Sequence, residues 1–266
     1  MLNVASIPAH LRSVRDAALA RIEDAGLSAS QPREQAIYDG WLLRYANGKA
    51  KRARSVNPIA AGDLPLEEKL NHCAAFYARQ GVPLLLRITP FSRPADIDDA
   101  LAALGYAAAE ETRVMMAALD GEATVTAPDV PVTPLERAEF GAVLAGLHGL
   151  DPARGAVERD RFAHSVVDGL YLVVREEGQA VACGCAVFDG TLVGVYGMAT
   201  ATTHRGRGMA TRLVADLLQR ARARGCITAY LQVDATNTPA RRAYAKFGFT
   251  DRYAYWYRSP PGKGRT

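Results

Sequence analysis

The chain has 266 residues, of which 49% are hydrophobic and 23% charged, a composition typical of a globular protein with a buried core. It has no run of 18 apolar residues and no basic flank followed by an apolar signal core, so we expect neither a membrane span nor secretion, but a cytoplasmic protein. The formal net charge is +4, with 14 basic and 16 acidic residues in 1–130 against 18 basic and 12 acidic residues in 131–266.

The first 120 residues contain a series of predicted helices and strands. Residues 10–25 are predicted to form one helix with an apolar face, and Pro32 interrupts the chain after it. Residues 41–45 and 54–56 are predicted strands that flank Asn47-Gly48, a strong hairpin signal. The later elements are an amphipathic helix, a buried strand, a second helix and a final strand, at 64–80, 84–89, 95–104 and 112–119.

The basic run KAKRAR at 49–54 could bind nucleic acid or form a solvated hairpin arm. No aromatic residues interleave with its charges to stack on bases, which favours the solvated arm. The excess of basic residues in the second half fits a polyanionic cofactor, although a solvated helix face accounts for most of them. We therefore expect no nucleic-acid partner.

Residues 120–134, DGEATVTAPDVPVTP, contain three prolines and no helical period, so the sequence predicts a linker here. We place a first domain at 1–120, the linker at 121–134 and a second domain at 135–266. The second half continues with two helices, at 135–147 and 156–167, and with strands at 171–176 and 180–188.

The four cysteines, Cys73, Cys183, Cys185 and Cys226, have no disulfide-framework spacing, which is typical of free thiols in a reducing compartment. Cys183 and Cys185 lie two residues apart on a predicted strand and so share one face. No second pair of Cys or His follows at ligand spacing, so buried small residues are favoured and no metal is expected.

The stretch GMATATTHRGRGMAT at 197–211 joins an apolar strand at 191–198 to a helical pattern that begins before Leu213. A helix start leaves its first four N–H groups without partners and carries the positive end of the helix dipole. Glycine at such a start lets an anion approach the backbone. The loop around Gly206 and Gly208 is therefore a candidate polyphosphate site.

Two familiar phosphate loops fit this stretch poorly. A Walker loop ends in Gly-Lys-Ser/Thr, where this chain has Met209, Ala210 and Thr211. The dinucleotide fingerprint is matched by Gly206 and Gly208, but Thr211 replaces its third glycine, and no acidic residue follows about 20 residues on.

The remaining pattern is Arg or Gln, two residues, Gly, one residue, then Gly or Ala, which Arg205, Gly208 and Ala210 meet. Downstream come a strand at 226–233, a helix start at Asn237-Thr238-Pro239, the segment ARRAYAKFGF and a last strand at 251–258. Together, over 132–258, these features resemble the GNAT superfamily of acyl-CoA-dependent N-acyltransferases.

An internal repeat extends this resemblance to the first half. Strand, proline, helix, Gly-aromatic and strand occur in the same order in both halves. The first half's counterpart of the phosphate loop, NPIAAGDLPLEEKL at 57–70, lacks the arginines, and its acidic residues Asp63, Glu67 and Glu68 would repel phosphate. We expect an α/β fold of two tandem GNAT-like domains, each a mixed, mostly antiparallel sheet flanked by helices, with the cofactor site lost from the first.

The resemblance implies acetyl-CoA as co-substrate and no metal. It assigns Tyr244 as the acid that protonates the leaving thiolate, although Tyr244 could instead be a core residue of its helix. Asn237 could bond the pantetheine arm or simply form a turn. The other cofactor-binding residues implied are Met198, Ala199, Thr200, Arg205, Gly206, Arg207, Gly208, Met209, Ala210 and Thr211.

The general base is not evident. Many relatives carry an acid on the strand before the phosphate loop, but TLVGVYGMAT has none, and Asp234, His148, His204 and Tyr196 are candidates by proximity alone. The sequence favours an N-acetyltransferase that acts on an amine. A non-catalytic acyl-CoA-binding protein and a dinucleotide oxidoreductase are the alternatives. The acceptor stays open, and so does the choice between monomer and homodimer.

Overall fold

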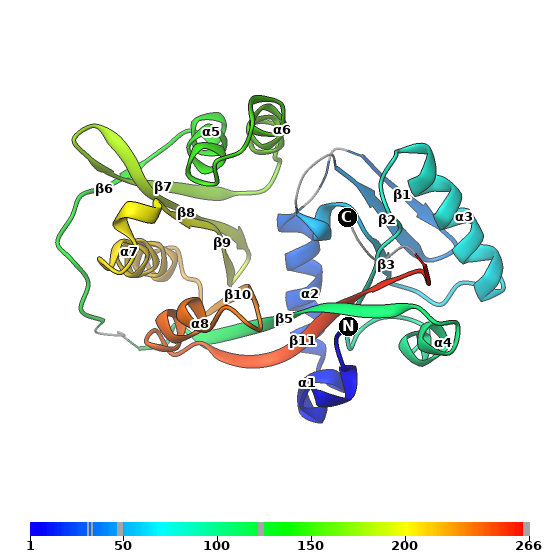
Figure 1. Cartoon of the computed structure of the whole chain (residues 1–266). Helices are drawn as coiled ribbons and strands as arrows, with labels where there is room; N and C mark the ends of the chain where they lie inside the picture. Colours follow the sequence, from blue (N-terminus) through cyan, green and yellow to red (C-terminus); the bar gives the residue numbers. More distant parts are fainter. Residues whose placement is uncertain (31, 33, 47–49, 122–124, 263–266) are drawn as a thin grey trace.

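We analysed a computed structural model of the chain, which describes residues 1–30, 32, 34–46, 50–121 and 125–262 (Figure 1). The strands are β1 Glu34–Tyr38, β2 Trp41–Tyr45, β3 Val56–Pro58, β4 Leu86–Ile88, β5 Ala107–Ala118, β6 Val132–Pro134, β7 Gly169–Glu176, β8 Gln179–Asp189, β9 Leu192–Thr200, β10 Thr228–Asp234 and β11 Thr250–Ser259. The α-helices are α1 Ala9–Arg12, α2 Ala17–Ala29, α3 Leu66–Arg79, α4 Ile97–Ala103, α5 Arg137–Leu147, α6 Pro152–Ala163, α7 Met209–Ala223 and α8 Thr238–Ala245. Three short 3-10 helices are η1 Val4–Ser6, η2 Lys51–Ala53 and η3 Thr202–His204.

The strands of the described residues form one mixed sheet in the order β1-β2-β3-β4-β11-β5-β10-β9-β8-β7-β6. Neighbouring strands are antiparallel except for two parallel pairs, β3 with β4 and β9 with β10. Each parallel pair is joined by a helix, α3 in the first half and α7 in the second. The mixed α/β fold expected from the sequence is confirmed.

Strands β5 and β11 connect the two halves of the molecule. β11, the last strand of the chain, pairs with β4 and with β5, and β5 in turn pairs with β10. Figure 1 shows these two long strands running beneath both halves. The C-terminal strand is anchored in the first half by Arg258, whose Nε and Nη2 donate to the carboxylate of Asp98 at 2.8 and 2.9 Å.

The helices cover both faces of the sheet. Successive strand residues point to opposite faces, so the residues of β8 show which helices lie on which face. Ala182 and Ala186 pack in the cluster under α7, whereas Cys183 and Cys185 pack under α5 and α6. On β10, Tyr230 points to α2 and its neighbours to α7. Helices α2, α5 and α6 therefore share one face, and α7 lies on the other.

Three local expectations need correction, and a fourth agrees with the structure. The single helix predicted at 10–25 is two helices, because Asp16 caps a new one through its Oδ1, which accepts from the Ala18 N–H at 2.8 Å. β1 was not predicted, and it pairs with β2 through Asp39 and Gly40 (φ 43° and 79°). β2 pairs antiparallel with β3 as expected, although Asn47-Gly48 lies outside the described residues. The segment predicted as linker contains β6.

Candidate functional site

Strands β9 and β10 separate at their carboxyl ends, and we call this opening the fork. Their parallel pairing runs from Leu192 with Thr228 to Val195 with Leu231, and the described residues show no pair beyond it. From there β10 stays paired with β5 and β9 with β8. At the fork, residues 196–200 of β9 therefore have no β10 partner along one edge.

A bulge in β9 produces the fork. Tyr196 pairs with Cys185 and Ala199 with Cys183, so Gly197 and Met198 lie opposite the single residue Gly184. Gly197 has a φ of 59°, and a Cβ there would lie 2.9 Å from the ring of Phe140. Glycine is therefore required at 197 both for the backbone conformation and for the close packing of α5.

The loop after β9 leads to the N-terminus of α7 with its amide groups free of side-chain caps. Gly208 is the N-cap residue, with φ 82°, and no side chain of the described residues caps the helix. Gly206 also has a positive φ, 76°, and a Cβ added there would meet no described atom within 4 Å. An open cradle beside an uncapped helix N-terminus fits a pyrophosphate group.

The two loop glycines allow a matched test of this geometry. Gly206→Ala should cost about 1 kcal/mol of unfolding free energy, the strain of a left-handed residue. Gly208→Ala carries the same strain, and its Cβ would also lie 2.9 Å from Cδ of Pro128, so it should cost about 2–4 kcal/mol. Urea unfolding of both variants measures the difference, and equal losses would contradict the contact with Pro128.

Two side chains of the loop, His204 and Arg207, approach Glu176 at the end of β7. His204 Nε2 lies 3.1 Å from a carboxylate oxygen of Glu176, and Arg207 lies 3.9 Å from the same oxygen. Thr203 Oγ1 contacts the other ring nitrogen of His204 at 2.8 Å. Both nitrogens of His204 are therefore engaged within the loop region, and Glu176 joins the site without having been predicted.

Tyr244 lies on α8, which begins just beyond the carboxyl end of β10. Its ring packs edge-on against Phe249, with centroids 6.0 Å apart, and joins the cluster under α7 that also receives Met198. Burial raises the pKa of Tyr244 to about 12. Its hydroxyl makes no hydrogen bond to any described residue, and its raised pKa keeps the phenol neutral at neutral pH.

Comparison with known proteins decides the family. Residues 17–258 match the model of the family described as "Probable histone acetyltransferase Rv0428c C-terminal". The chain belongs to this family. It is also 30% identical over 226 residues to the uncharacterized N-acetyltransferase YobR of Bacillus subtilis, covering 82% of this chain and 89% of that protein.

Solved structures show the same fold. A GCN5-related N-acetyltransferase from Kribbella flavida superposes with a TM-score of 0.68 at 17% identity, covering 92% of this chain and 95% of that one. A tandem GNAT protein from the clavulanic acid biosynthesis pathway gives a TM-score of 0.57 at 13% identity, covering 74% and 70% of the two chains. The family match and the 30% identical relative make the chain an acyltransferase, and these structures show that it has the GNAT fold, as its motifs indicated.

The predicted cofactor-binding residues of this GNAT chain lie in two adjoining groups. Met198, Ala199 and Thr200 form the free edge of β9 at the fork, and the residues from Arg205 to Thr211 form the loop and first turn of α7. The side chain of Met209 is buried in the core, which leaves only its backbone for a ligand. Asn237 caps α8 by accepting from the Ala240 N–H at 3.2 Å, as its helix-start pattern predicted.

The candidate bases have other partners. Asp234 accepts from the N–H and hydroxyl of Thr236, at 2.7 and 2.5 Å. Tyr196 donates to the hydroxyl of Tyr230 at 2.9 Å, and burial raises its pKa well above the ordinary value. His148 is the exposed C-cap residue of α5. The geometry singles out none of them as the base.

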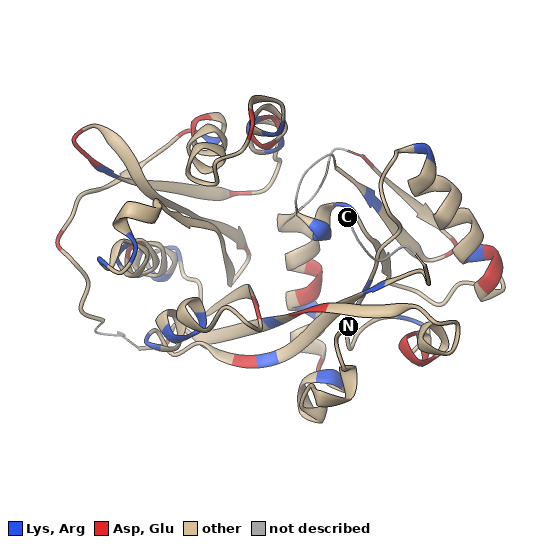
Figure 2. Cartoon of the chain, viewed as in Figure 1, with Lys and Arg blue, Asp and Glu red and all other residues tan. Residues whose placement is uncertain are grey.

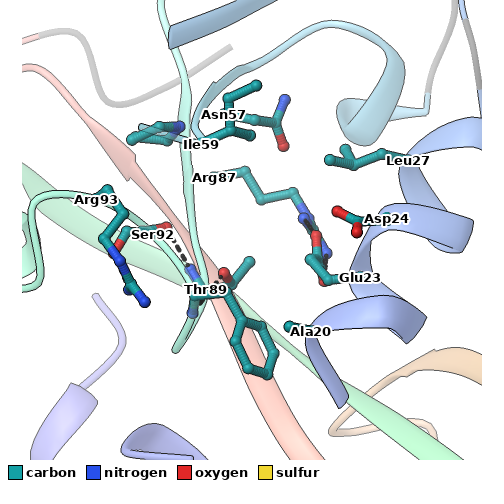
Figure 3. Close-up of a pocket in the computed structure, with 12 residues that line it drawn as sticks. Ala20, Glu23, Asp24, Leu27, Asn57, Ile59, Arg87, Thr89, Ser92 and Arg93 are labelled. Carbon is teal, nitrogen blue, oxygen red and sulfur yellow. Dashed lines mark hydrogen bonds and ion pairs between the residues drawn. The ribbon is translucent and has the colours of Figure 1, made fainter. Parts of the chain in front are cut away.

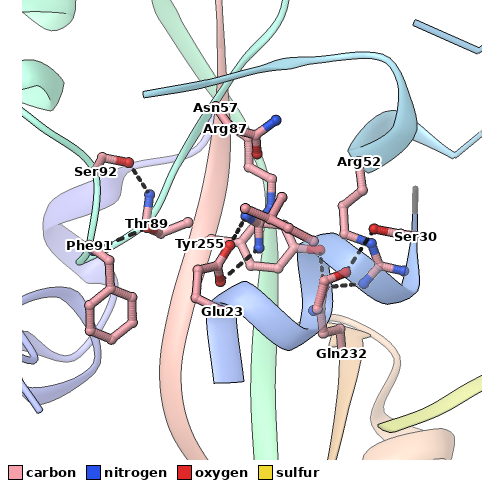
Figure 4. Close-up of polar contacts among 12 residues, drawn as sticks. Glu23, Ser30, Arg52, Asn57, Arg87, Thr89, Phe91, Ser92, Gln232 and Tyr255 are labelled. Atoms are coloured by element: carbon pink, nitrogen blue, oxygen red, sulfur yellow. Dashed lines mark hydrogen bonds and ion pairs between the residues drawn. The ribbon is translucent and has the colours of Figure 1, made fainter. Parts of the chain in front are cut away.

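Helix α2 and Arg52, both from the first half, cover the fork (Figure 4). A Cβ on Gly26 of α2 would lie 2.7 Å from the amide nitrogen of Gln232, so the helix passes close above β10. Arg52 donates to the amide oxygen of Gln232, and its guanidinium lies 5.7 Å from the Tyr196 ring centroid. The expectation of a solvated arm is therefore wrong for Arg52, which tertiary contacts hold against the second half.

The loop between β3 and α3, the expected counterpart of the phosphate loop, has two amides that are already bonded. The N–H groups of Asp63 and Leu64, just before α3, donate to the carboxylate of Asp39 at 2.9 and 3.0 Å. Lys69 lies 2.9 Å from the same carboxylate. The Asp63 N–H and Lys69 lower the pKa of Asp39, so an internal anion occupies this position.

A pocket of about 220 Å³ lies beside the parallel pair β3 and β4, between their carboxyl ends and α2 (Figure 3). Arg87 projects into it from β4 and pairs with Glu23 of α2. Phe91, Ser92 and Arg93 line another part of the pocket. The pocket occupies, in the first half, the place relative to the sheet that the fork occupies in the second.

In the described part of the chain no helix is long and apolar enough to cross a membrane, and no group of three or more His, Cys, Asp or Glu could hold a metal. All four cysteines are free and buried, as their spacing indicated.

Proposed function

We propose that this GNAT chain transfers an acetyl group from acetyl-CoA to a primary amine. The observation that carries the proposal is the fork beside an uncapped helix N-terminus. The edge of β9 would bind the pantetheine arm, and the amides from Arg205 to Thr211 would bind the pyrophosphate. When bound, acetyl-CoA supplies an electrophilic thioester carbonyl.

The reaction we propose is direct attack. The neutral amine nitrogen forms a bond to the carbonyl carbon, which passes through a tetrahedral intermediate stabilised by backbone N–H groups of β9. The carbon–sulfur bond then breaks, and the thiolate takes the hydroxyl proton of Tyr244. The amine loses one proton to solvent or to a base, and a proton from solvent restores the Tyr244 hydroxyl, so that the net products are an amide and free CoA.

We further propose a division of labour between two units, 1–120 and 135–266, joined through 121–134. The second would bind the cofactor. The first would have no cofactor of its own, since Asp39 already accepts from the amides before α3, and would shape the acceptor site through α2 and Arg52. The description of the matched family names a histone, so a basic protein segment is one acceptor class to test.

The thermal midpoint of the purified protein in excess acetyl-CoA, CoA, ATP or NADH tests the cofactor assignment. A ligand at a hundredfold excess over its Kd stabilises the folded state by about 2.7 kcal/mol, which raises the midpoint by roughly 5–10 °C. We expect this rise with the CoA compounds and not with NADH. A rise with NADH alone would instead indicate a dinucleotide enzyme.

Thiol release from acetyl-CoA in the presence of an amine panel then separates an enzyme from a non-catalytic acyl-CoA-binding protein. The enzyme should release CoA thiol in proportion to added amine. A binder would show the thermal rise and no amine-dependent thiol.

A further inference from the structure

Three arginines, Arg44, Arg52 and Arg87, lie close enough for their charges to interact, and Figure 4 shows Arg52 and Arg87 beside α2. Among the described residues, Glu23 is the one carboxylate that forms an ion pair with any of them. Arg87 pairs with Glu23. Arg44 donates to neutral oxygens, the Leu27 carbonyl at 2.9 Å and the Ser30 hydroxyl at 3.5 Å. Arg52 donates to the neutral amide oxygen of Gln232. Within the described chain neither Arg44 nor Arg52 forms an ion pair.

Such a cluster is costly in a folded protein. Arg44 and Arg87 are each 1% exposed, and a buried charge needs an opposite charge or a full set of hydrogen bonds. Burial and the neighbouring guanidiniums of Arg87 and Arg52 lower the pKa of Arg44 to about 10. The adjacent cation Lys51 is already paired with Glu110 and adds no unbalanced charge. An anion from a ligand would restore the balance.

Arg52 marks the point where that anion would lie. Tyr196 and Gln232, its two contacts in the second half, are the first residues beyond the last β9–β10 pair. From Tyr196 to Thr200, β9 extends by about 13 Å at the usual rise of a strand, and the loop to α7 follows. Arg52 is therefore remote from the pyrophosphate cradle and close to where the acyl carbon and the amine would meet.

We propose that the acceptor is an amine that also carries an anionic group, a carboxylate or a phosphate, and that Arg52 is its counter-ion. The proposal rests on the acetyltransferase function proposed above. A guanidinium binds both anions through paired hydrogen bonds. The same cluster repels polyamines and lysine-rich segments, which would bring additional positive charge into the fork.

Matched amine pairs test the acceptor class. The pairs are phenylalanine with phenethylamine and O-phosphoethanolamine with ethanolamine, with spermidine and a lysine-rich peptide as polycations. We expect kcat/KM, measured by thiol release, to be at least tenfold higher for one anionic member than for its neutral partner. The carboxylate and phosphate pairs show which anion is preferred.

The variant Arg52→Gln should raise KM for the preferred anionic amine by about 10- to 100-fold, as expected for a lost charge-assisted contact. The affinity for acetyl-CoA should not change. Lys51→Gln is the matched control, because it removes the neighbouring charge but leaves Arg52 in place, and it should behave like the unaltered protein. Arg52→Lys should retain part of the preference for the anion.

The outcomes separate this inference from the proposed function. If neutral or polycationic amines are the better substrates, or if Arg52→Gln leaves the preference unchanged, the inference is wrong and the acetyltransferase function stands. If no amine supports thiol release, the same amines are titrated calorimetrically into protein saturated with CoA, and their binding decides whether the inference stands. Binding of an anionic amine that Arg52→Gln weakens would support the inference, and no such binding would overturn it.

Discussion

Replacing Tyr244 with Phe is expected to lower turnover by about 10²- to 10⁴-fold, the usual contribution of a positioned general acid. The affinity for acetyl-CoA should stay within about twofold, because the ring and its packing against Phe249 are retained. The pKa of about 12 keeps this phenol protonated throughout the pH range of an enzyme assay, so the loss should appear at every pH from 6 to about 9. Initial rates of thiol release measure it.

The hydroxyl of Tyr244 has no partner in the described part of the protein, so the variant should fold normally. Its unfolding free energy should lie within about 0.5 kcal/mol of the original, as for substitutions that break no native contact. Tyr106→Phe, far along the chain in the first half, is the matched control and should leave turnover unchanged. If Tyr244→Phe is equally active, Tyr244 is only a core residue of α8, and another donor protonates the thiolate.

The second half was predictable because its signals are local. A strand, a glycine loop and a helix follow one another within 191–223, and the helix start at Asn237 depends on a cap and a proline one or two residues away. Even the missed strand β1 carries a local signal, the Asp39-Gly40 turn, whose two positive φ angles suit a two-residue hairpin. Such patterns are set by neighbouring residues, so they can be read without the fold.

The connection between the halves was not predictable in the same way. Two tandem domains were expected to have separate sheets, but β11 pairs with β4 and β5, which precede it by more than 130 residues. Strand pairing at this separation is decided by which edges and apolar faces are available in three dimensions. The residue pattern of a segment predicts that it is a strand but not which other strand it pairs with.

Arg52 shows why part of the candidate site could not be predicted from the sequence. A run of basic residues without aromatic neighbours is usually solvated, and nothing within 49–54 distinguishes Arg52 from Lys51 beside it. The difference is tertiary: Lys51 meets the exposed Glu110, whereas Arg52 meets Gln232 and Tyr196, from the other half of the chain. Residue type predicted a charge but not its environment.

Replacing Arg87 with Met is expected to give the largest loss of stability, about 3–5 kcal/mol at neutral pH, because it leaves a buried carboxylate without its counter-charge. Arg87 pairs with Glu23, which is 7% exposed, and its guanidinium stacks 3.7 Å from the Tyr255 ring centroid. Tyr253 donates a further hydrogen bond to Glu23 at 2.7 Å. Urea unfolding at fixed pH measures the loss.

A double variant separates the charge from the packing. Glu23→Gln with Arg87→Met removes both charges, so it should recover much of the stability that Arg87→Met loses, since replacing a whole buried pair is often nearly neutral. If the double variant is as unstable as the sum of the single ones, the loss comes from packing against Tyr255, and the ion pair contributes little.

The stability that the Glu23–Arg87 pair contributes should depend on pH in a direction set by the pKa of Glu23. Burial alone would raise the pKa of Glu23, but the charge of Arg87 and hydrogen bonds from Arg87 and Tyr253 outweigh it and lower the pKa below its ordinary value of 4.5. The pair therefore contributes its full stability above about pH 4.5 and loses it as the pH falls through the lowered pKa. In Arg87→Met the burial of Glu23, the largest single influence on its pKa, is opposed only by the Tyr253 bond and the charge of Arg52, so the pKa of Glu23 should rise. Stability should then increase as the pH falls from 7.5 to 5. The gap between the two proteins should narrow over that interval, and a gap of constant size would show that Glu23 does not titrate with its partner removed.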